Sequence, residues 1–456
     1  MSDNLIKGKA QTVLGLVDPQ SLGPTMTHEH LLIDFRVMFN PPADASVQHR
    51  SMEPITLENV GWVRYNHYSN LDNVMLMDED IATDEARLFK RIGGGTIVDA
   101  TTLGIGRDPL ALTRIARDVG INIIMGAGFY VDAVHPEDMD SRGVDDLTRQ
   151  IIGELEDGVG DTGVKAGIIG EVGCTWPLTD NERKVLHASA VAQQETGSAI
   201  LIHPGRDENA PAEIIEVLAE SGADVNRVIM GHLDRTVTKF ETLQRLASTG
   251  CYLEWDLFGN ESSYYPLSDF DMPSDAQRMD VIRRMVHEEN YGQRIVVAHD
   301  ICTKHRLTKY GGHGYGHFLE NVVPRMRRKG FTADEVHDIT VGNPAQILTF
   351  VEPQFSWPHR SRHPGQERYA VLARVSHEQT LGRLSGQNDH QEAAKWELHR
   401  TGGDADDVND RVGNHGHQEH QQRPALLHPD LHSGLEITIE SKSFEYGVST
   451  VADRVT

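Results

Sequence analysis

Short apolar runs rich in β-branched residues recur along the chain up to about Phe350, and most are followed by a stretch with the apolar spacing of a helix. The eight runs are 25–30, 96–102, 123–129, 167–173, 199–204, 228–234, 251–256 and 295–300. Strands that alternate with helices pair in parallel. Eight such units in about 330 residues predict an α/β fold of the (β/α)8 TIM-barrel type, which typically takes ~250 residues and accepts insertions.

Helix-start signals mark several of the intervening segments. In residues 210–220 (APAEIIEVLAE), Pro211 falls in the first turn of an amphipathic pattern. Thr332 and Glu335 have the spacing of a capping box. Asn343, which precedes a proline, indicates the N-cap of a last helix. These signals support helices between and after the predicted strands.

The composition of the chain changes after the last of these patterns. Residues 353–456 are rich in His, Gln, Arg, Asp and Gly and contain few apolar runs. Such a segment cannot bury enough apolar surface to offset the entropy lost on ordering. We therefore predict a barrel domain at residues 1–352 and a largely disordered C-terminal extension at residues 353–456. Within the extension, only residues 435–440 (LEITIE) resemble a strand.

The charge and the cysteine content narrow the class of protein. The formal net charge is −25, which argues against nucleic acids and anionic membranes as partners. No run reaches the eighteen or so apolar residues of a spanning helix, and the first residues lack the apolar core of a signal peptide. Three cysteines form no disulfide framework. We expect a cytoplasmic protein.

Residues of the types that bind metals stand at the ends of five predicted strands: His28, His30, Glu171, His203, His232 and Asp300. In a (β/α)8 barrel the catalytic groups lie at the C-terminal ends of the strands. Each residue alone is more often a hydrogen-bonded polar group at a strand end, and among 24 histidines about one His-x-His pair is expected by chance. A second pair, His415 and His417, ends no strand. The occurrence of all six on one rim favours a metal site.

The spacing of these residues predicts how they would share the metal ions. Residues i and i+2 of a strand point the same way, so His28 and His30 would bind one ion and the histidines of the fifth and sixth strands a second. Glu171 would bridge both ions, and Asp300 would close the ring beside the first strand. Four imidazoles and two carboxylates favour Zn²⁺ or a similar ion over Ca²⁺ or Mg²⁺. We expect two divalent ions per chain, with zinc favoured.

The sequence from about residue 8 to 350 resembles the phosphotriesterase family of the amidohydrolase superfamily. The resemblance is carried by QTVLGLVDP, THEHLL, GAGFYVDA, GIIGEVGC, IHPGR, GHLDRT, CYLEWDLFG, VAHDICTK and KYGGHGYGH. The family's site has HEH on the first strand, a bridging carboxylate on the fourth, a histidine on each of the fifth and sixth, and an aspartate on the eighth. The founding phosphotriesterases bridge their metals with a carbamylated lysine, whereas Glu171 stands there in this sequence; Lys165 lies near the start of that strand.

The resemblance and the ligand set together imply a mechanism. A hydroxide that bridges two metals would attack the electrophilic carbon or phosphorus of the substrate. Asp300 would accept the proton and pass it to the leaving group, and it can bind the first metal as well.

Cationic and aromatic residues follow several of the predicted strands. Tyr130 follows the third strand, Arg206 the fifth, Arg235 the sixth, and Lys304 and Arg306 the eighth. The cations would bind a carboxylate, sulfonate or phosphate of a substrate. The alternative is that they pair with carboxylates of the same rim, and that the tyrosine is a packed loop aromatic.

The substrate class follows from the resemblance. The superfamily cleaves phosphoesters, lactones and amides, and related animal proteins act on N-acyl amino acids such as N-acetyltaurine. We therefore expect amide hydrolysis of a small anionic N-acyl amino acid, with lactone or phosphoester hydrolysis as the alternative. A non-catalytic, metal-bound scaffold is the alternative from another class. The expected partner is a small anionic molecule, and a homodimer is left open.

Three long loops are expected at the barrel mouth, at residues 36–60, 260–275 and 303–318. Long loops at this face of a barrel usually shape substrate choice, so we regard them as candidate lids. Cys174 and Cys302 stand close to predicted ligands, but we interpret them as small buried residues.

Overall fold

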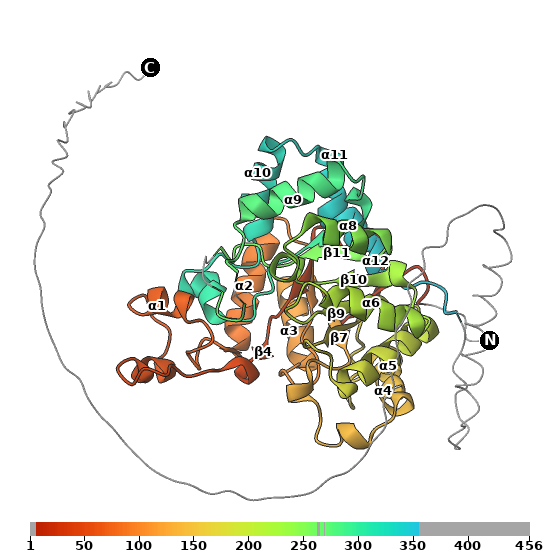
Figure 1. The fold of residues 1–456 in the computed structure, drawn as a ribbon, viewed down its shortest axis with the longest axis horizontal. Helices are drawn as coiled ribbons and strands as arrows, with labels where there is room; N and C mark the ends of the chain where they lie inside the picture. The colour runs from red at the N-terminus through yellow and green to blue at the C-terminus, as the bar shows by residue number, and fades with distance from the viewer. Residues whose placement is uncertain (1–5, 262–264, 269, 355–456) are drawn as a thin grey trace, which may run out of the picture. The chain divides into compact units, whose positions relative to one another are not determined.

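The computed structural model describes residues 6–261, 265–268 and 270–354 (Figure 1). Its central element is a parallel sheet of eight strands whose spatial order follows the chain. The strands are β3 (Thr25–Glu29), β6 (Thr96–Asp99), β7 (Asn122–Ala127), β8 (Ile168–Gly173), β9 (Ile200–His203), β10 (Val228–Met230), β11 (Tyr252–Trp255) and β12 (Ile295–Val297). All eight predicted strands are confirmed.

The two outer strands of this sheet meet. The Asp300 N–H, just after β12, donates to the carbonyl of His28 in β3 at 3.0 Å. Thr27 Oγ1 of β3 lies 3.2 Å from the carbonyl oxygen of Val297 in β12. The sheet therefore curves back on itself, and the fold is the predicted (β/α)8 barrel.

Helices separate consecutive strands, in the alternating order that the sequence predicts (Figure 1). They are α2 (Glu79–Arg91), α3 (Pro109–Val119), α4 (Val144–Glu156), α5 (Asp180–Thr196), α6 (Ala210–Glu220), α7 (Leu233–Thr236), α8 (Phe240–Ser248) and α9 (Asp275–His287). After β12 follow α10 (Val323–Arg328), α11 (Ala333–His337) and α12 (Asn343–Leu348).

Side-chain caps fix where several helices begin. Asp78 accepts from a backbone N–H in the first turn of α2, Asp108 does so for α3, Thr179 for α5 and Ser274 for α9. Each cap satisfies an N–H that has no partner inside its own helix. The strand–helix boundaries are therefore set by local sequence.

The helix-start signals of the sequence are mostly confirmed. Helix α6 spans the predicted residues with Pro211 in its first turn. The Thr332 hydroxyl accepts from the Glu335 N–H at 3.1 Å, and the Glu335 carboxylate accepts from the Thr332 N–H at 2.8 Å, so the capping box before α11 is present.

The prediction that Asn343 caps a separate last helix is wrong. A π-helical turn, η11 (Asp338–Gly342), joins α11 directly to α12, and Gly342 has helical φ and ψ of −65° and −54°. The Asn343 amide instead donates to the carbonyls of Gly292 and Ile295, at 2.8 Å each. These long-range bonds give the side chain a tertiary role that a capping pattern cannot predict.

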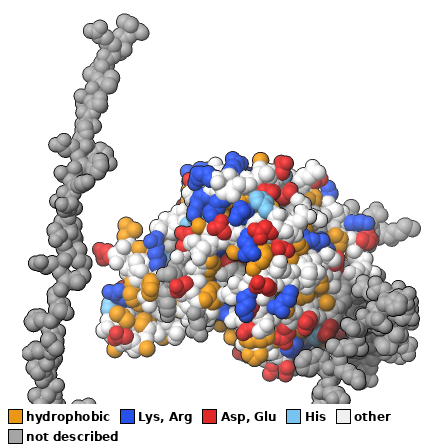
Figure 2. Space-filling model, turned by 45° about the horizontal axis from the view of Figure 1, so that its top comes forward, with side chains coloured by type: hydrophobic (Ala, Val, Ile, Leu, Met, Phe, Trp, Pro, Cys, Tyr) orange, Lys and Arg blue, Asp and Glu red, His pale blue; other side chains and the backbone are white. Residues whose placement is uncertain are grey.

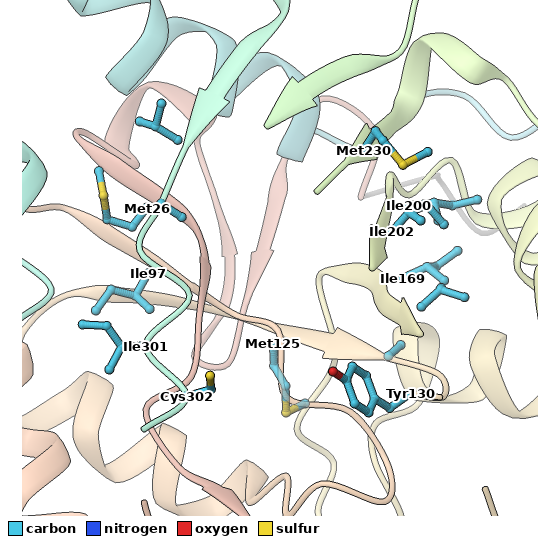
Figure 3. Close-up of a cluster of buried hydrophobic side chains, with 14 of the residues drawn as sticks. Met26, Ile97, Met125, Tyr130, Ile169, Ile200, Ile202, Met230, Ile301 and Cys302 are labelled. Carbon is cyan, nitrogen blue, oxygen red and sulfur yellow. The ribbon is translucent and has the colours of Figure 1, made fainter. Parts of the chain in front are cut away.

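Alternate strand residues pack into two separate clusters of buried apolar side chains. The larger cluster joins the strands to the helices and contains Met26, Ile97, Met125, Ile169, Ile202 and Met230 (Figure 3). The smaller one contains strand residues of the opposite parity with two from β1 and α12: Val98, Ile124, Leu201, Ile229, Val296, Ala10 and Leu348. Because successive side chains of a strand point to opposite faces, the smaller cluster fills the barrel interior.

Two short antiparallel pairs lie outside the barrel. β1 (Ala10–Thr12) pairs with β2 (Gly15–Val17). β4 (Ile33–Asp34) pairs with β5 (Met75–Leu76), and the long segment between them carries α1 (Val60–Tyr65). Figure 1 shows this segment to one side of the barrel strands. It contains the first of the predicted lid loops.

Residues 355–456 are not described, so the predicted disorder of the extension and the strand-like residues 435–440 lie outside the described residues. The domain boundary after residue 352 stays a prediction. In the ranges that are described, none of the helices combines the length and apolar character needed to cross a bilayer. Figure 2 shows acidic and basic side chains interspersed on one face of the molecule.

Candidate metal centre

The Glu171 carboxylate lies among the four predicted histidine ligands. Its Oε1 is 3.3 Å from His30 Nε2. Its Oε2 is 3.3 Å from His28 Nε2, 2.8 Å from His203 Nδ1 and 3.5 Å from His232 Nε2. All five side chains are buried. The structure thus brings together ligand types from β3, β8, β9 and the residues after β10, as the strand-end argument predicts.

The backbone next to Glu171 is packed too tightly to admit a side chain at the preceding position, Gly170. Gly170 has φ +117°, and a Cβ there would stand 2.2 Å from the carbonyl oxygen of Leu201 on β9. The register between β8 and β9 also shifts between Ile169 and Val172. Because glycine tolerates this conformation, the strand can turn the Glu171 carboxylate into the cluster.

Asp300 completes the group from the opposite side. Its Oδ1 lies 3.2 Å from His30 Nε2 and 3.9 Å from His28 Nε2. Its backbone has φ +49°, a left-handed conformation that is unusual for a residue with a side chain. The Asp300 side chain is 14% exposed, whereas those of His28 and His30 are exposed by 1% or less. Asp300 is therefore more exposed to the pocket than Glu171, whose side chain is 3% exposed.

Hydrogen bonds at Nδ1 orient two of the histidine rings, those of His30 and His232. The Thr101 hydroxyl donates to the carbonyl of Leu32 at 3.2 Å, so its oxygen accepts from His30 Nδ1–H at 2.9 Å. Asp256 Oδ1 accepts from His232 Nδ1–H at 2.8 Å. Each bond leaves the Nε2 lone pair facing the cluster, as metal-binding imidazoles require.

The donor set fits a divalent cation. Both ring nitrogens of His28 are buried, and the nearest carboxylate oxygens, of Glu171 at 3.3 Å and Asp256 at 3.2 Å, do not have hydrogen-bond geometry. Among the described residues, three groups have all their ligand atoms within 4.8 Å of one another: His28, Glu171 and His232; His28, His30 and Asp300; and His28, Glu254 and Asp256. Imidazole nitrogens with carboxylate oxygens are typical ligands of zinc and related metals.

The electrostatics of the cluster favour bound positive charge. Burial alone would lower the pKa of His30, but its hydrogen bonds to Asp300 and Glu171 raise that pKa to about 9. Burial would raise the pKa of Glu171, but the neighbouring His28 and His203 hold it well below its usual range. Without a metal, protons on imidazoles balance the carboxylates, and a cation would take their place.

The carboxylates of Glu254, in β11, and Asp256, directly after β11, support the cluster. The sequence did not lead us to assign them this role. Glu254 Oε2 lies 3.4 Å and Asp256 Oδ2 3.2 Å from His28 Nδ1. The Thr27 hydroxyl donates to Glu254 at 2.5 Å, and burial raises the pKa of Glu254 to about 7. The available signal was two acids at positions i and i+2 at the end of a predicted strand, where both point to the ligand face.

A pocket opens on the cluster. Its floor includes His30, Glu171, His203 and Asp300. Its walls come from the predicted loops or residues that flank them: Phe35, His67, Tyr68, Tyr265, Met272 and His305. Sequence reasoning located the loops but not these side chains, and the first loop contributes through its flanks instead of residues 36–60.

Asn73 connects two of these pocket walls by hydrogen bonds. Its side-chain oxygen accepts from the His305 N–H at 2.9 Å, and its backbone carbonyl accepts from the Lys304 N–H at 2.9 Å. Its side-chain amide donates to the carbonyl of His67 at 2.7 Å. One buried residue therefore joins the segment between β4 and β5 to the loop after β12.

Arg206 lines the pocket with a guanidinium that has no carboxylate partner among the described residues. Its Nε–H donates to the Tyr265 hydroxyl at 2.9 Å. Burial opposes its charge, but the neighbouring phenols of Tyr265, Tyr68 and Tyr130 raise the pKa of Arg206. The arginine stays charged, so the pocket contains a cation available to an anionic ligand.

Arg235 and Tyr130 also line the pocket, on either side of His203. Arg235 Nη2 lies 3.1 Å from His203 Nε2 and donates to the carbonyl of Pro204 at 3.2 Å. The Tyr130 hydroxyl lies 3.3 Å from His203 Nδ1. Both predicted substrate residues are therefore beside the cluster, where a bound molecule can touch them.

The two cations after β12 are engaged elsewhere. Lys304 Nζ lies 2.6 Å from Asp72 Oδ1, and Lys304 does not line the pocket. The predicted substrate role of Lys304 is thus replaced by the alternative, an ion pair with a nearby carboxylate. Arg306 lines the pocket, but it donates to the carbonyls of Asp300 at 2.5 Å and Phe258 at 3.4 Å. It supports the loop backbone.

With this geometry established, comparison with known proteins identifies the family. The model of the phosphotriesterase family matches residues 8–348. The chain belongs to the phosphotriesterase family. Human N-acetyltaurine hydrolase is 49% identical over 347 residues, which are 76% of this chain and 99% of that protein.

Solved structures agree with this family assignment. A resiniferatoxin-binding protein from Rhodobacter sphaeroides is 32% identical, with a TM-score of 0.73 over 75% of this chain and 96% of that one. A lactonase from Listeria monocytogenes is 25% identical, with a TM-score of 0.61 over 75% of this chain and 100% of that one. Phosphotriesterase-family proteins are metal-dependent hydrolases, so this chain is a hydrolytic enzyme with a candidate metal site.

Proposed function

We propose that this phosphotriesterase-family enzyme hydrolyses the amide bond of a small N-acyl amino acid that carries an anionic group, with N-acetyltaurine as the reference substrate. Relatives named N-acetyltaurine hydrolase are 48% identical in cattle and 49% in humans, over 76% of this chain. The structural observation that carries the proposal is Arg206, a pocket cation whose hydrogen-bond partner is a phenol.

An anionic substrate group would complete the environment of Arg206. A guanidinium removed from water is stabilised by a carboxylate, sulfonate or phosphate that accepts its parallel N–H groups. Tyr265 occupies only the Nε side of this arginine. A sulfonate or carboxylate in the pocket would take the remaining donors, and the acyl group would then face the metal cluster.

Two divalent ions, with zinc favoured, fit the ligands. One ion would be held by His28, His30, Glu171 and Asp300, and the other by Glu171, His203 and His232. When bound, such ions polarise a substrate carbonyl and lower the pKa of water towards neutrality.

The protein's own groups supply the remaining steps. Asp300, the partly exposed carboxylate of the cluster, accepts the proton of the attacking water and returns it to the leaving amine as the C–N bond breaks. Arg206 fixes the distal anion, which orients the amide. Tyr130 and Arg235 contact the acyl end beside His203. The three cysteines are free and buried, which supports a cytoplasmic setting.

Lactone hydrolysis is the second candidate, because a lactonase shares this fold at 25% identity. Phosphoester hydrolysis uses the same chemistry. A metal-bound scaffold without activity is the candidate from another class. All of them share the cluster, and they differ in what the pocket accepts.

The test is metal content per chain by mass spectrometry, with hydrolysis of N-acetyltaurine, a lactone and a phosphotriester on the same sample. About two ions and chelator-sensitive cleavage of N-acetyltaurine are expected. Cleavage of only the lactone or the phosphotriester would replace the amide proposal. Two ions without turnover of any substrate would favour the scaffold, and a chain that binds no metal after reconstitution with zinc would overturn the metal site.

A further inference from the structure

Glu29 stands between the two histidines of the HEH sequence but is not part of the metal cluster. It is fully buried and does not line the pocket. Its carboxylate contacts the loop after β12, about 270 positions later in the chain. Neither the ligand set nor the proposed mechanism uses this buried acid.

The two oxygens of Glu29 hold the residues on either side of Asp300. Oε1 accepts from the backbone N–H of His299 at 2.8 Å and from its ring Nδ1–H at 2.6 Å. Oε2 accepts from the backbone N–H of Ile301 at 3.1 Å. The carboxylate thus binds the backbone N–H groups of both residues that flank Asp300.

The His299 ring is fixed in the form that this contact needs. Its Nε2 accepts from the backbone N–H of Phe318 at 3.0 Å. An imidazole that accepts at Nε2 carries its proton at Nδ1, which is the nitrogen facing Glu29. The ring therefore connects Glu29 to the segment before α10.

Asp300 depends on this support because its backbone is left-handed, with φ +49°. Residues with a Cβ rarely adopt this conformation unless their surroundings hold them there. The Asp300 N–H donates to His28, and its carbonyl accepts from Arg306. With Glu29 holding the neighbouring N–H groups, the backbone of Asp300 is fixed where its Oδ1 lies 3.2 Å from His30 Nε2.

We infer that Glu29 is a positioning residue for Asp300. It holds the loop so that the Asp300 carboxylate stands within reach of the metal cluster and of a substrate. The inference rests on the proposed function in that Asp300 handles the proton. It also gives the central residue of HEH a role of its own: β3 supplies two ligands and the support for a third.

A purely structural role, the closing of the barrel, is the competing explanation, and Glu85 offers a matched control. Glu85 is a buried glutamate of α2 that accepts from the backbone N–H groups of Thr308 at 3.1 Å and Lys309 at 2.9 Å. It therefore holds the same loop in the same way, a few residues beyond Asp300, but it touches neither neighbour of that residue.

The experiment compares Glu29→Gln with Glu85→Gln in the metal-loaded full chain. A glutamine has only one side-chain oxygen, so the backbone N–H of either His299 or Ile301 loses its acceptor. We expect kcat for N-acetyltaurine to fall about tenfold to a hundredfold in Glu29→Gln with KM within about threefold, because small misplacements of a catalytic group have effects of this size. Glu85→Gln should keep kcat within about twofold of the wild type. Its melting temperature should nevertheless fall about as much as that of Glu29→Gln.

A double variant tests whether the effect passes through Asp300. In an Asp300→Asn background, Glu29→Gln should change kcat by less than about twofold, because coupled residues are not additive. The inference is overturned if the falls in kcat of Asp300→Asn and Glu29→Gln multiply in the double variant. It is also overturned if Glu29→Gln has the same kcat as Glu85→Gln. If Glu29→Gln does not fold, His299→Leu removes one of the three bonds and should give a smaller fall in kcat.

Metal titration separates this inference from the proposed function. Glu29→Gln should bind one of the two ions about tenfold more weakly than Glu85→Gln, because support of a ligand contributes to affinity. Equal affinities together with equal kcat values would reject the positioning role. A wild-type chain that cleaves no substrate would reject the proposed function, and the titration would still decide the role of Glu29.

Discussion

Asp256 accepts two hydrogen bonds from His232, one from its backbone N–H and one from its ring Nδ1–H, each at 2.8 Å. Burial alone would raise the pKa of Asp256, but His232 and His28 hold it well below its usual range. The carboxylate thus stays ionised and fixes both the position and the tautomer of the imidazole. The left-handed backbone of His232, with φ +53°, is held by the same residue.

Replacing Asp256 by Asn should therefore weaken metal binding without removing any ligand. The asparagine side chain has one oxygen where the carboxylate has two. One of the two hydrogen bonds from His232 is therefore lost. We expect the affinity for at least one ion to fall about tenfold to a hundredfold. Metal titration followed by mass spectrometry checks this, and two ions bound as tightly as in the wild type would contradict it.

Asp300→Asn should separate metal binding from turnover. The amide keeps the size of the side chain and one oxygen ligand but cannot accept the proton. We expect most of the metal to remain and kcat to fall about a hundredfold or more. The matched control is Asp72→Asn, which changes an acid that pairs with Lys304 and does not line the pocket. A near-normal kcat for Asp300→Asn would remove this residue as the base.

Arg206→Met should act on anionic substrates only. The variant keeps much of the apolar stem but loses the charge that faces the pocket. We expect KM for N-acetyltaurine to rise about tenfold to a hundredfold, the size of a charge-assisted hydrogen bond. KM for a neutral N-acetyl amide should stay within about twofold. Lys304→Met, which removes a cation already paired with Asp72, is the control; equal losses on both substrates would make Arg206 structural.

The metal-free protein should lose stability as the pH rises from about 6.5 to about 9. The pKa of His30 is raised from 6.5 to about 9 in the folded chain by Asp300 and Glu171, against the effect of burial. The protonated form therefore stabilises the folded state fully below pH 6.5, and this contribution is lost as the pH passes through 9. Thermal melts of chelated wild type and His30→Asn across this range check the prediction, which fails if both show the same slope.

The fold and the six predicted ligands follow from sequence because both depend on local pattern. Each apolar run marks a strand, and the residue that ends it is placed on one rim by the closure of the barrel. His28, Glu171 and Asp300 could thus be brought together although they are far apart in the chain. Their roles as ligands stay predictions until metal is measured.

Other parts could not be predicted because they depend on contacts between distant loops. His67 and Tyr265 lie in long segments without periodicity, so no pattern places them on the pocket. Lys304 has the position of a substrate residue, but Asp72 lies on another loop and neutralises it. Asn343 has the sequence of a cap, yet its amide donates to the carbonyls of Gly292, before β12, and Ile295, the first residue of β12.

The link through Asn73 has a consequence for how this enzyme could acquire new substrates. In many barrels the loops at the mouth can be exchanged one at a time, and selectivity changes while the chemistry is left alone. Here one asparagine joins the segment after β4 to the loop that carries Asp300 and His305. An insertion, deletion or graft between β4 and β5 would disturb the proton-handling residue as well as the pocket wall. Divergence in specificity should therefore proceed by point substitutions at residues such as Tyr68, with the length of this segment conserved.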